Sequence, residues 1–316
     1  MKQVHTVLGP ITPDQMGVTL PHEHLCSADW SMRMNFGPRF CDMRRVLPRA
    51  VQQVNRAKGV GVSTIVDATA VNLGRDIHLL REVSQQTGVH LIASTGFYAQ
   101  DEPWLKEQDP GYLFDLLDEE CKKGIYDTDA KPGIVKCAVG RQGLTPTRKK
   151  ILKLSAKVAL ANDLPLFCHH EAATQAGPEI LDLLLAEGMD PKRVVLGHAG
   201  DSQDLAYIFS LLERGCFIGD DRYGYGPLFN ATPHRIQTLI ALRTEGFLGQ
   251  VLLSHDLSTY LGFWEPMETT LANPAIYGDA DFTFLFRQVF PILEKAGFSP
   301  EELRQLTTDN PRALFS

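Results

Sequence analysis

The chain has 316 residues, 44% of them hydrophobic, and a formal net charge of −7. This length is enough to bury a large core, in one domain or in two. The negative charge argues against a nucleic-acid-binding protein, and no apolar run approaches the ~18 residues of a membrane helix. The first residues lack the apolar segment of a signal peptide, so we expect a cytoplasmic protein.

The six cysteines are scattered, and none has the Cys-x-x-Cys spacing of a metal or redox motif. Cys137, Cys168 and Cys216 lie inside apolar runs that are typical of buried strands. This pattern predicts buried, reduced thiols, which again favours a cytoplasmic protein.

In chain order, turn signals at Gly9-Pro10 and Pro13-Asp14 precede a first apolar run that predicts a strand. The long segment 26–42 follows, and a loop of this length suggests a functional role. Helical patterns and short apolar runs then alternate. The predicted strands are 17–20, 63–67, 89–95, 133–138, 164–169, 193–198, 216–220 and 250–256. The predicted helices between them are 47–58, 75–87, 112–123, 147–161, 178–187, 203–214 and 233–245.

One helical segment separates each predicted strand from the next, and this alternation predicts a parallel sheet. Eight such units fit a (β/α)8 TIM barrel of roughly 250 residues plus extensions. We therefore predict a single domain, 1–316, with a short N-terminal extension, a second long loop at 257–280 and C-terminal helices from 281 and from 300. A doubly wound open sheet is the alternative, but no Gly-rich phosphate loop follows any strand.

His22 and His24 end the first strand, and side chains two residues apart on a strand point to the same face. Two adjacent imidazoles are poor core material because their nitrogens need partners, but neutral imidazole is a good ligand for divalent metals. The spacing alone is a weak signal. It predicts a metal site only if other strands supply similar groups.

Six of the ten histidines lie at predicted strand ends, where the reactive groups of such barrels gather. These are His22, His24, His169, His170, His198 and His255. His169 and His170 are neighbours, as are His255 and Asp256, so only one of each pair can face inward. Alternation does not decide which, because a buried parallel strand is apolar on both faces. The remaining histidines are interpreted as ordinary hydrogen-bonded side chains: His5, His78, His90 and His234.

Lys136 lies in the middle of an apolar strand, where an unpaired ammonium group is costly. Its amine could reach the barrel rim or pair with a carboxylate. Alternatively, the amine reacts with carbon dioxide to give a carbamate, an anionic oxygen donor that can bridge two cations.

The order of these residues along the strands resembles the phosphotriesterase family of the amidohydrolase superfamily, and the resemblance extends to the last residues, 309–316. It implies two divalent metal ions, zinc first, with manganese, cobalt or iron as alternatives. The implied ligands are His22, His24 and Asp256 for one ion and His169 and His198 for the other, bridged by carboxylated Lys136 and a hydroxide.

Within this family, the chain is similar to the phosphotriesterase-like lactonases. Tyr98 follows the third strand as in those proteins, and residues 221–224, Asp-Arg-Tyr-Gly, resemble their loop after the seventh strand. Arg222 stands where true phosphotriesterases have a relay histidine. The resemblance implies that Tyr98 orients the substrate carbonyl and that Asp256 passes a proton to the leaving group. Residues 257–264 depart from the lactonases.

These features predict a metal-dependent hydrolase of lactones or carboxylic esters, with a promiscuous phosphotriesterase activity. One alternative is a phosphotriester or phosphodiester hydrolase. Another is a non-catalytic barrel that binds metal or a small ligand. The expected partner is a small-molecule substrate, without nucleic acid or membrane, and a homodimer is the candidate oligomeric state.

Overall fold

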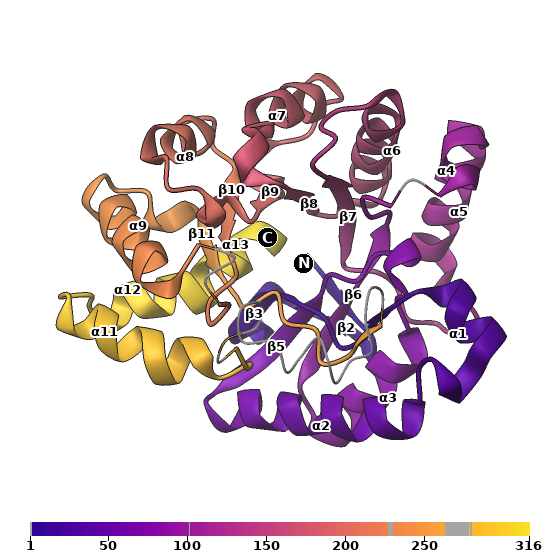
Figure 1. Cartoon of the computed structure of the whole chain (residues 1–316), viewed down its shortest axis with the longest axis horizontal. Helices are drawn as coiled ribbons and strands as arrows, with labels where there is room; N and C mark the ends of the chain where they lie inside the picture. Colours follow the sequence, from indigo (N-terminus) through magenta and orange to yellow (C-terminus); the bar gives the residue numbers. More distant parts are fainter. Residues whose placement is uncertain (1, 101, 227–229, 263–277, 279) are drawn as a thin grey trace.

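The computed structural model describes residues 2–100, 102–226, 230–262, 278 and 280–316. Eight parallel strands lie side by side around a common centre, and helices surround them (Figure 1). The predicted (β/α)8 barrel is therefore confirmed. The strands are β3 (Val18–Glu23), β5 (Val62–Asp67), β6 (His90–Gly96), β7 (Ile134–Val139), β8 (Leu166–His170), β9 (Val194–Gly197), β10 (Phe217–Asp220) and β11 (Val251–Leu253).

The strands pair in sequence order from β3 to β11, and every pairing is parallel. Hydrogen bonds then join the first strand to the last. The Asp256 backbone N–H donates to the His22 carbonyl at 3.0 Å, and the His22 N–H donates to Ser254 Oγ at 3.1 Å. This nearly complete closure rules out the doubly wound open sheet.

The outer helices are α2 (Met43–Gly59), α3 (Ile77–Thr87), α5 (Pro110–Lys123), α6 (Pro146–Asn162), α7 (Gly177–Ala186), α8 (Leu205–Leu212) and α9 (Thr232–Thr244). Helix α2 illustrates why they form. The Asp42 side chain caps its N-terminus, and Val46, Ala50, Val54 and Ala57 form one buried stripe at helical spacing.

Segment 26–42, predicted as a loop, instead contains β4 (Ser27–Ala28), α1 (Trp30–Phe36) and η2 (Gly37–Arg39). Asp29 caps the N-terminus of α1, because its carboxylate accepts from the Met32 N–H. Strand β4 pairs with β12 (Leu261–Gly262). Most of the second predicted loop, 257–280, lies outside the described residues.

The chain ends extend the barrel. The N-terminal residues form a hairpin of β1 (Val4–Thr6) and β2 (Gly9–Ile11). A short helix, α4 (Pro103–Glu107), precedes α5. The C-terminal elements are η8 (Leu285–Val289), α11 (Phe290–Lys295), α12 (Pro300–Arg304), η9 (Gln305–Asp309) and α13 (Asn310–Phe315).

The barrel interior is apolar at one end and polar at the other. Val66, Phe167 and Val195 pack inside the barrel together with Leu314 and Phe315 of α13, which close the amino-terminal end of the strands. The polar residues gather at the opposite, carboxyl end. The six cysteines are buried free thiols, as predicted. No helix in the described part of the chain is both long and apolar enough to span a membrane.

Candidate metal centre

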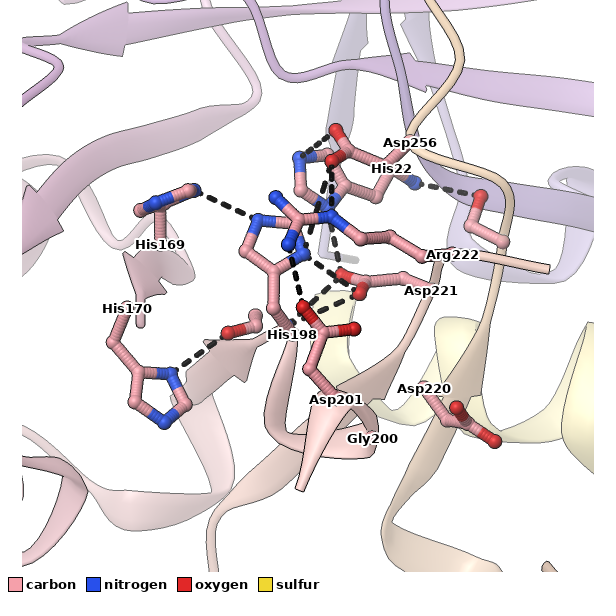
Figure 2. A network of polar contacts seen from close by, with 12 residues as sticks. His22, His169, His170, His198, Gly200, Asp201, Asp220, Asp221, Arg222 and Asp256 are labelled. Carbon is pink, nitrogen blue, oxygen red and sulfur yellow. Dashed lines mark hydrogen bonds and ion pairs between the residues drawn. The ribbon is translucent and has the colours of Figure 1, made fainter. Parts of the chain in front are cut away.

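Figure 2 shows several of the predicted site residues close together: His22, His169, His198, Arg222 and Asp256. His22 lies in β3 and His24 follows that strand, Lys136 lies in β7, His169 lies in β8, and His198 follows β9. These five side chains are buried. Asp256, beyond β11, reaches them with only 13% of its side chain exposed.

The first group contains His22, His24 and Asp256. Oδ1 of Asp256 lies 3.3 Å from His22 Nε2 and 3.1 Å from His24 Nε2. The other ring nitrogen of His24, Nδ1, contacts the Thr69 hydroxyl at 2.8 Å. The two rings therefore direct their Nε2 atoms at one carboxylate oxygen.

Asp221 orients two of the rings. Its Oδ2 lies 2.7 Å from His22 Nδ1, and its Oδ1 lies 2.9 Å from His198 Nδ1. Burial alone would raise the pKa of Asp221, but His198 and His22 hold it well below its usual value. Because an ionised carboxylate only accepts hydrogen bonds, both Nδ1 atoms carry protons. Burial lowers the pKa of His22 to about 3, so this ring is neutral and keeps a lone pair on Nε2.

The second group contains His169 and His198. Nδ1 of His169 lies 2.8 Å from His198 Nε2 and 3.3 Å from the Tyr98 hydroxyl. Burial and the neighbouring His198 lower the pKa of His169 well below its usual value, so this ring is neutral. Burial raises the pKa of Tyr98, so its hydroxyl keeps its proton.

Lys136 is completely buried, with its Nζ 2.9 Å from His22 Nε2 and 4.3 Å from the centre of the Phe167 ring. Burial lowers the pKa of the amine to about 8, against the opposing charges of Asp256 and Asp221. The amine therefore loses its proton more readily than that of an exposed lysine, and it lies beside His22.

Arg222 links Asp256 to a buried chain of charges. Its Nε donates to Asp256 Oδ2 at 2.9 Å, and its Nη1 donates to Asp201 Oδ2 at 2.5 Å. Arg235 of α9 then joins Asp201 to Asp220. Burial alone would lower the pKa of Arg222, but the two carboxylates raise it well above its usual value, so the guanidinium stays charged.

The neighbours His170 and His255 point away from the centre. Nδ1 of His170 donates to the Gly197 carbonyl at 2.7 Å, and its Nε2 accepts from the Tyr207 hydroxyl at 2.8 Å. Nδ1 of His255 contacts Glu23 Oε1 at 2.7 Å, and its Nε2 accepts from the Leu285 N–H at 3.2 Å. Both rings have protein partners on both nitrogens.

The backbone is unusual at two of the inward-facing residues. His198 has φ 66° and Asp256 has φ 53°, a left-handed conformation that is uncommon outside glycine. His198 directly follows β9, and Asp256 lies three residues beyond the end of β11. Such conformations cost free energy and are found mainly at functional sites, where the surrounding contacts impose them.

Sequence reasoning missed Asp221 and Asp201 as site residues. Asp221 contacts His22, 199 positions away in the chain, so no local pattern reveals the pair. One signal was present: two acidic residues follow the apolar run of β10 at the end where the histidines gather.

The phosphotriesterase family model matches residues 2–315 of the chain. The chain belongs to the phosphotriesterase family. A relative named phosphotriesterase homology protein, from Mycobacterium tuberculosis, is 29% identical, covering 100% of this chain and 98% of its own length. The aryldialkylphosphatase of Saccharolobus solfataricus is 32% identical, with 97% of each chain covered. The N-acetyltaurine hydrolase of Danio rerio is 24% identical, covering 98% of this chain and 97% of the relative.

Membership of the phosphotriesterase family makes the protein a metal-dependent hydrolase with a small-molecule substrate. The residues at the strand ends fit a metal ion. His22 Nε2 and Asp256 Oδ1 both carry lone pairs, yet they lie 3.3 Å apart. No proton on either atom can join them, whereas a cation between them would bind both. His22, His24 and Asp256 form one group of atoms close enough to hold an ion, and His22, His198 and Asp221 form another, although hydrogen bonds already join the two rings of the second group to Asp221.

Proposed function

We propose that the inward-facing residues hold two divalent metal ions, with zinc the first choice for this set of imidazole and carboxylate donors. Manganese, cobalt and iron are the alternatives. The support is the convergence of His22 Nε2 and His24 Nε2 on Asp256 Oδ1 and the short distance between His198 Nε2 and His169 Nδ1. The proposed ligands are His22, His24 and Asp256 for one ion, His169 and His198 for the other, and Lys136 for both.

An ammonium group has no lone pair and a neutral amine has only one, so Lys136 can bridge two ions only after its amine is converted to a group with more than one donor atom. Reaction with carbon dioxide gives a carbamate with two oxygens. The position of Nζ, 2.9 Å from His22 Nε2 in a fully buried site, supports this modification. An apolar environment also favours the neutral amine that this reaction requires.

The metal ions, when bound, polarise the scissile carbonyl or phosphoryl group and lower the pKa of water. The chain's own residues would position the substrate and move protons. The Tyr98 hydroxyl, held beside His169, can donate a hydrogen bond to the oxygen on which negative charge develops. Asp256, held by Arg222, can accept a proton from the nucleophilic water and pass it to the leaving oxygen.

Among hydrolases of this family, we propose that lactones and carboxylic esters are the substrates. The observation that carries this is the Arg222 ion pair. Because Arg222 is held charged between Asp256 and Asp201, it cannot accept the proton and carry it away from Asp256. The proton therefore returns to the leaving group, and a lactone keeps its leaving alkoxide tethered within reach.

The test is a comparison of kcat/KM for γ- and δ-lactones, acylated homoserine lactones, aryl esters and phosphotriesters with metal-reconstituted enzyme. We expect at least one class of lactone to exceed the phosphotriesters. A phosphotriester that is hydrolysed faster than every lactone and ester would contradict the substrate assignment while leaving the metal site intact.

Phosphotriester hydrolysis is the second candidate, because the Saccharolobus solfataricus relative is named an aryldialkylphosphatase. An amide is a further candidate substrate, because the relative from Danio rerio is named an N-acetyltaurine hydrolase. A non-catalytic barrel is disfavoured, because both Asp256 and Lys136 are present and reach the site. Phosphotriesters and an N-acylated amine belong in the same substrate panel.

For the oligomeric state we propose a homodimer. Trp30, Met34 and Phe36 of α1 are exposed, as are Trp104 of α4 and Tyr126 near the end of α5. Exposed apolar side chains gathered as they are in α1 are typical of an interface between copies. Light scattering during size-exclusion chromatography should give twice the mass of the chain.

A further inference from the structure

Arg235 lies on α9, outside the barrel, and none of its side chain is exposed. Burial alone would lower the pKa of its guanidinium, but Asp201 and Asp220 raise that pKa above its usual value. The group is therefore a buried positive charge, which costs free energy unless acceptors surround it. The identity of these acceptors shows which parts of the protein the charge holds in place.

Every nitrogen of the Arg235 guanidinium has an acceptor. Nη1 donates to Asp220 Oδ1 at 2.9 Å, and Nη2 donates to Asp201 Oδ1. Nε donates to the Asn230 backbone carbonyl at 2.9 Å. Asp220 is the last residue of β10, and Asp201 ends the turn η6 (Ala199–Asp201). Arg235 therefore connects this turn to the neighbouring strand.

The turn η6 is packed closely against its neighbours. A Cβ atom at position 200 would overlap the Asp220 carboxylate, so only glycine fits there. The side-chain amide of Asn230 donates to the Gly200 carbonyl at 2.8 Å. Asp220 is itself held, because the Tyr223 hydroxyl donates to its Oδ2 at 2.5 Å. These contacts fix the position of the Asp201 carboxylate.

Two arginines share that carboxylate, one on each oxygen. Arg235 occupies Oδ1 of Asp201, and Arg222 Nη1 donates to Oδ2 at 2.5 Å. Arg222 Nε donates instead to Asp256 Oδ2 at 2.9 Å, so Arg222 joins the two carboxylates in Figure 2. The arginine fork commonly binds both oxygens of one carboxylate with two parallel hydrogen bonds. The presence of Arg235 on Oδ1 prevents Arg222 from doing so at Asp201.

We propose that Arg235 is a positioning residue, which keeps Arg222 Nε on Asp256 by occupying one oxygen of Asp201. Without Arg235, the Arg222 fork turns to both oxygens of Asp201 and releases Asp256. The catalytic consequence rests on the proposed function, in which Asp256 passes a proton to the leaving oxygen. Release of Asp256 slows that transfer. The departure of a basic alkoxide needs this proton, whereas a nitrophenolate leaves without it.

The first measurement follows the hydrogen bond between Arg222 and Asp256 by NMR, in full-length protein reconstituted with zinc and labelled in its arginines. The exchange of the Arg222 Nε proton with water reports how often the bond opens. Arg222→Lys identifies the signal by removing it. Arg235→Lys keeps the charge without the fork, and it should accelerate the exchange about tenfold or more, as expected for one hydrogen bond to a charged group. An unchanged rate would overturn the proposal.

A milder variant covers the case in which Arg235→Lys does not fold. Asp220→Asn keeps the shape of the side chain and weakens only the hold on Arg235 Nη1, so it should also accelerate the exchange of the Arg222 proton. Arg243→Lys is the matched control, because Arg243 lies on the same helix but donates to Glu302. An acceleration in the control equal to that in the Asp220 variant would overturn the proposal.

A double variant tests the route of the effect. In the background of Asp201→Asn, Arg235→Lys should add little to the exchange rate, because the residue that connects Arg235 to Arg222 is already altered. A full additive effect of the two substitutions would show that Arg235 does not act through Asp201, and it would contradict the proposal.

The second measurement tests the catalytic consequence. In Arg235→Lys, kcat/KM should fall about tenfold for a lactone and less than about twofold for a p-nitrophenyl ester. Equal losses for both substrates would indicate a loss of active protein and contradict a role in proton transfer. A wild-type protein that hydrolyses neither substrate would contradict the proposed function, and the exchange rates would still decide whether Arg235 positions Arg222.

Discussion

Two sets of buried histidines lie at the same strand ends, and they differ in what their ring nitrogens contact. The outward set, His170 and His255, has a protein partner on every nitrogen. In the inward set, the second nitrogens of His22 and His198 face other proposed ligands: Asp256 and Lys136 for His22, and His169 for His198. Burial alone therefore does not distinguish a ligand from a structural histidine, whereas the second nitrogen does.

The largest effect should come from removing the side chain of Lys136, which contacts His22 of the inward set. Lys136→Ala should lose metal and reduce kcat/KM on the order of a thousandfold or more, since the metal's stabilisation of the transition state amounts to several kcal/mol. Added short carboxylic acids should restore part of both, because they can occupy the space of the carbamate. A variant with full metal content and an unchanged rate would rule out Lys136 as a bridge.

Asp221 tests whether orientation matters as well as ligation. Asp221→Asn keeps the shape but removes the charge that fixes the protons of His22 and His198 on Nδ1. We expect metal affinity to fall about 10- to 100-fold, as for other residues that orient metal-bound histidines. Competition with a chelator measures this. Unchanged affinity would show that the two rings are oriented without Asp221.

A substitution of Tyr98, which contacts His169 of the inward set, tests whether its hydroxyl binds the substrate. Tyr98→Phe keeps the ring and removes the hydroxyl, which should cost about 1–3 kcal/mol, or roughly ten- to a hundredfold in lactone turnover. Phosphotriesters should lose less, because their phosphoryl oxygen can rely on the metal. An equal loss for both substrate classes would indicate that the hydroxyl orients His169 instead of the substrate.

Substitutions in the outward set should lower the stability of the protein and leave its activity almost unchanged. His170→Asn should keep its metals and its kcat/KM within about twofold, but it should lower the unfolding free energy by about 1–3 kcal/mol, because the Gly197 carbonyl and the Tyr207 hydroxyl lose partners. Chemical denaturation and metal analysis measure the two properties. A loss of metal in this variant would break the distinction between the two sets.

The pH dependence of stability tests separately whether His170 of the outward set contributes to folding. Burial lowers the pKa of His170 from 6.5 to about 4 in the folded protein. As the pH falls below 6.5, the unfolded chain binds this proton and the folded chain does not, so stability is lost until about pH 4. The loss is at most about 3 kcal/mol. His170→Asn should show a shallower decline over this window; an identical decline would exclude His170 as its source.

The barrel was predictable from sequence because eight apolar runs alternate with helical stretches, and this alternation has few structural solutions. The choice between His169 and His170 was not, because β8 is buried on both faces and its pattern is apolar throughout. The resemblance to a family, not periodicity, selected His169.

Other features depend on contacts between distant segments. Asp221 acts on rings delivered by β3 and β9, so only the closed barrel brings the three residues together. Strand β11 ends at Leu253, earlier than predicted, because the chain leaves the sheet before the left-handed Asp256. Helix α1 had a local signal, the capping residue Asp29, that the unusual composition of segment 26–42 obscured.

The most direct test of the central claim is the metal content of active protein, measured by elemental analysis alongside the specific activity. The account predicts two divalent ions per chain in the wild type and in His170→Asn, and a loss of bound metal in His22→Asn in step with activity. Fully active wild-type protein that holds no more than one tightly bound ion would contradict it.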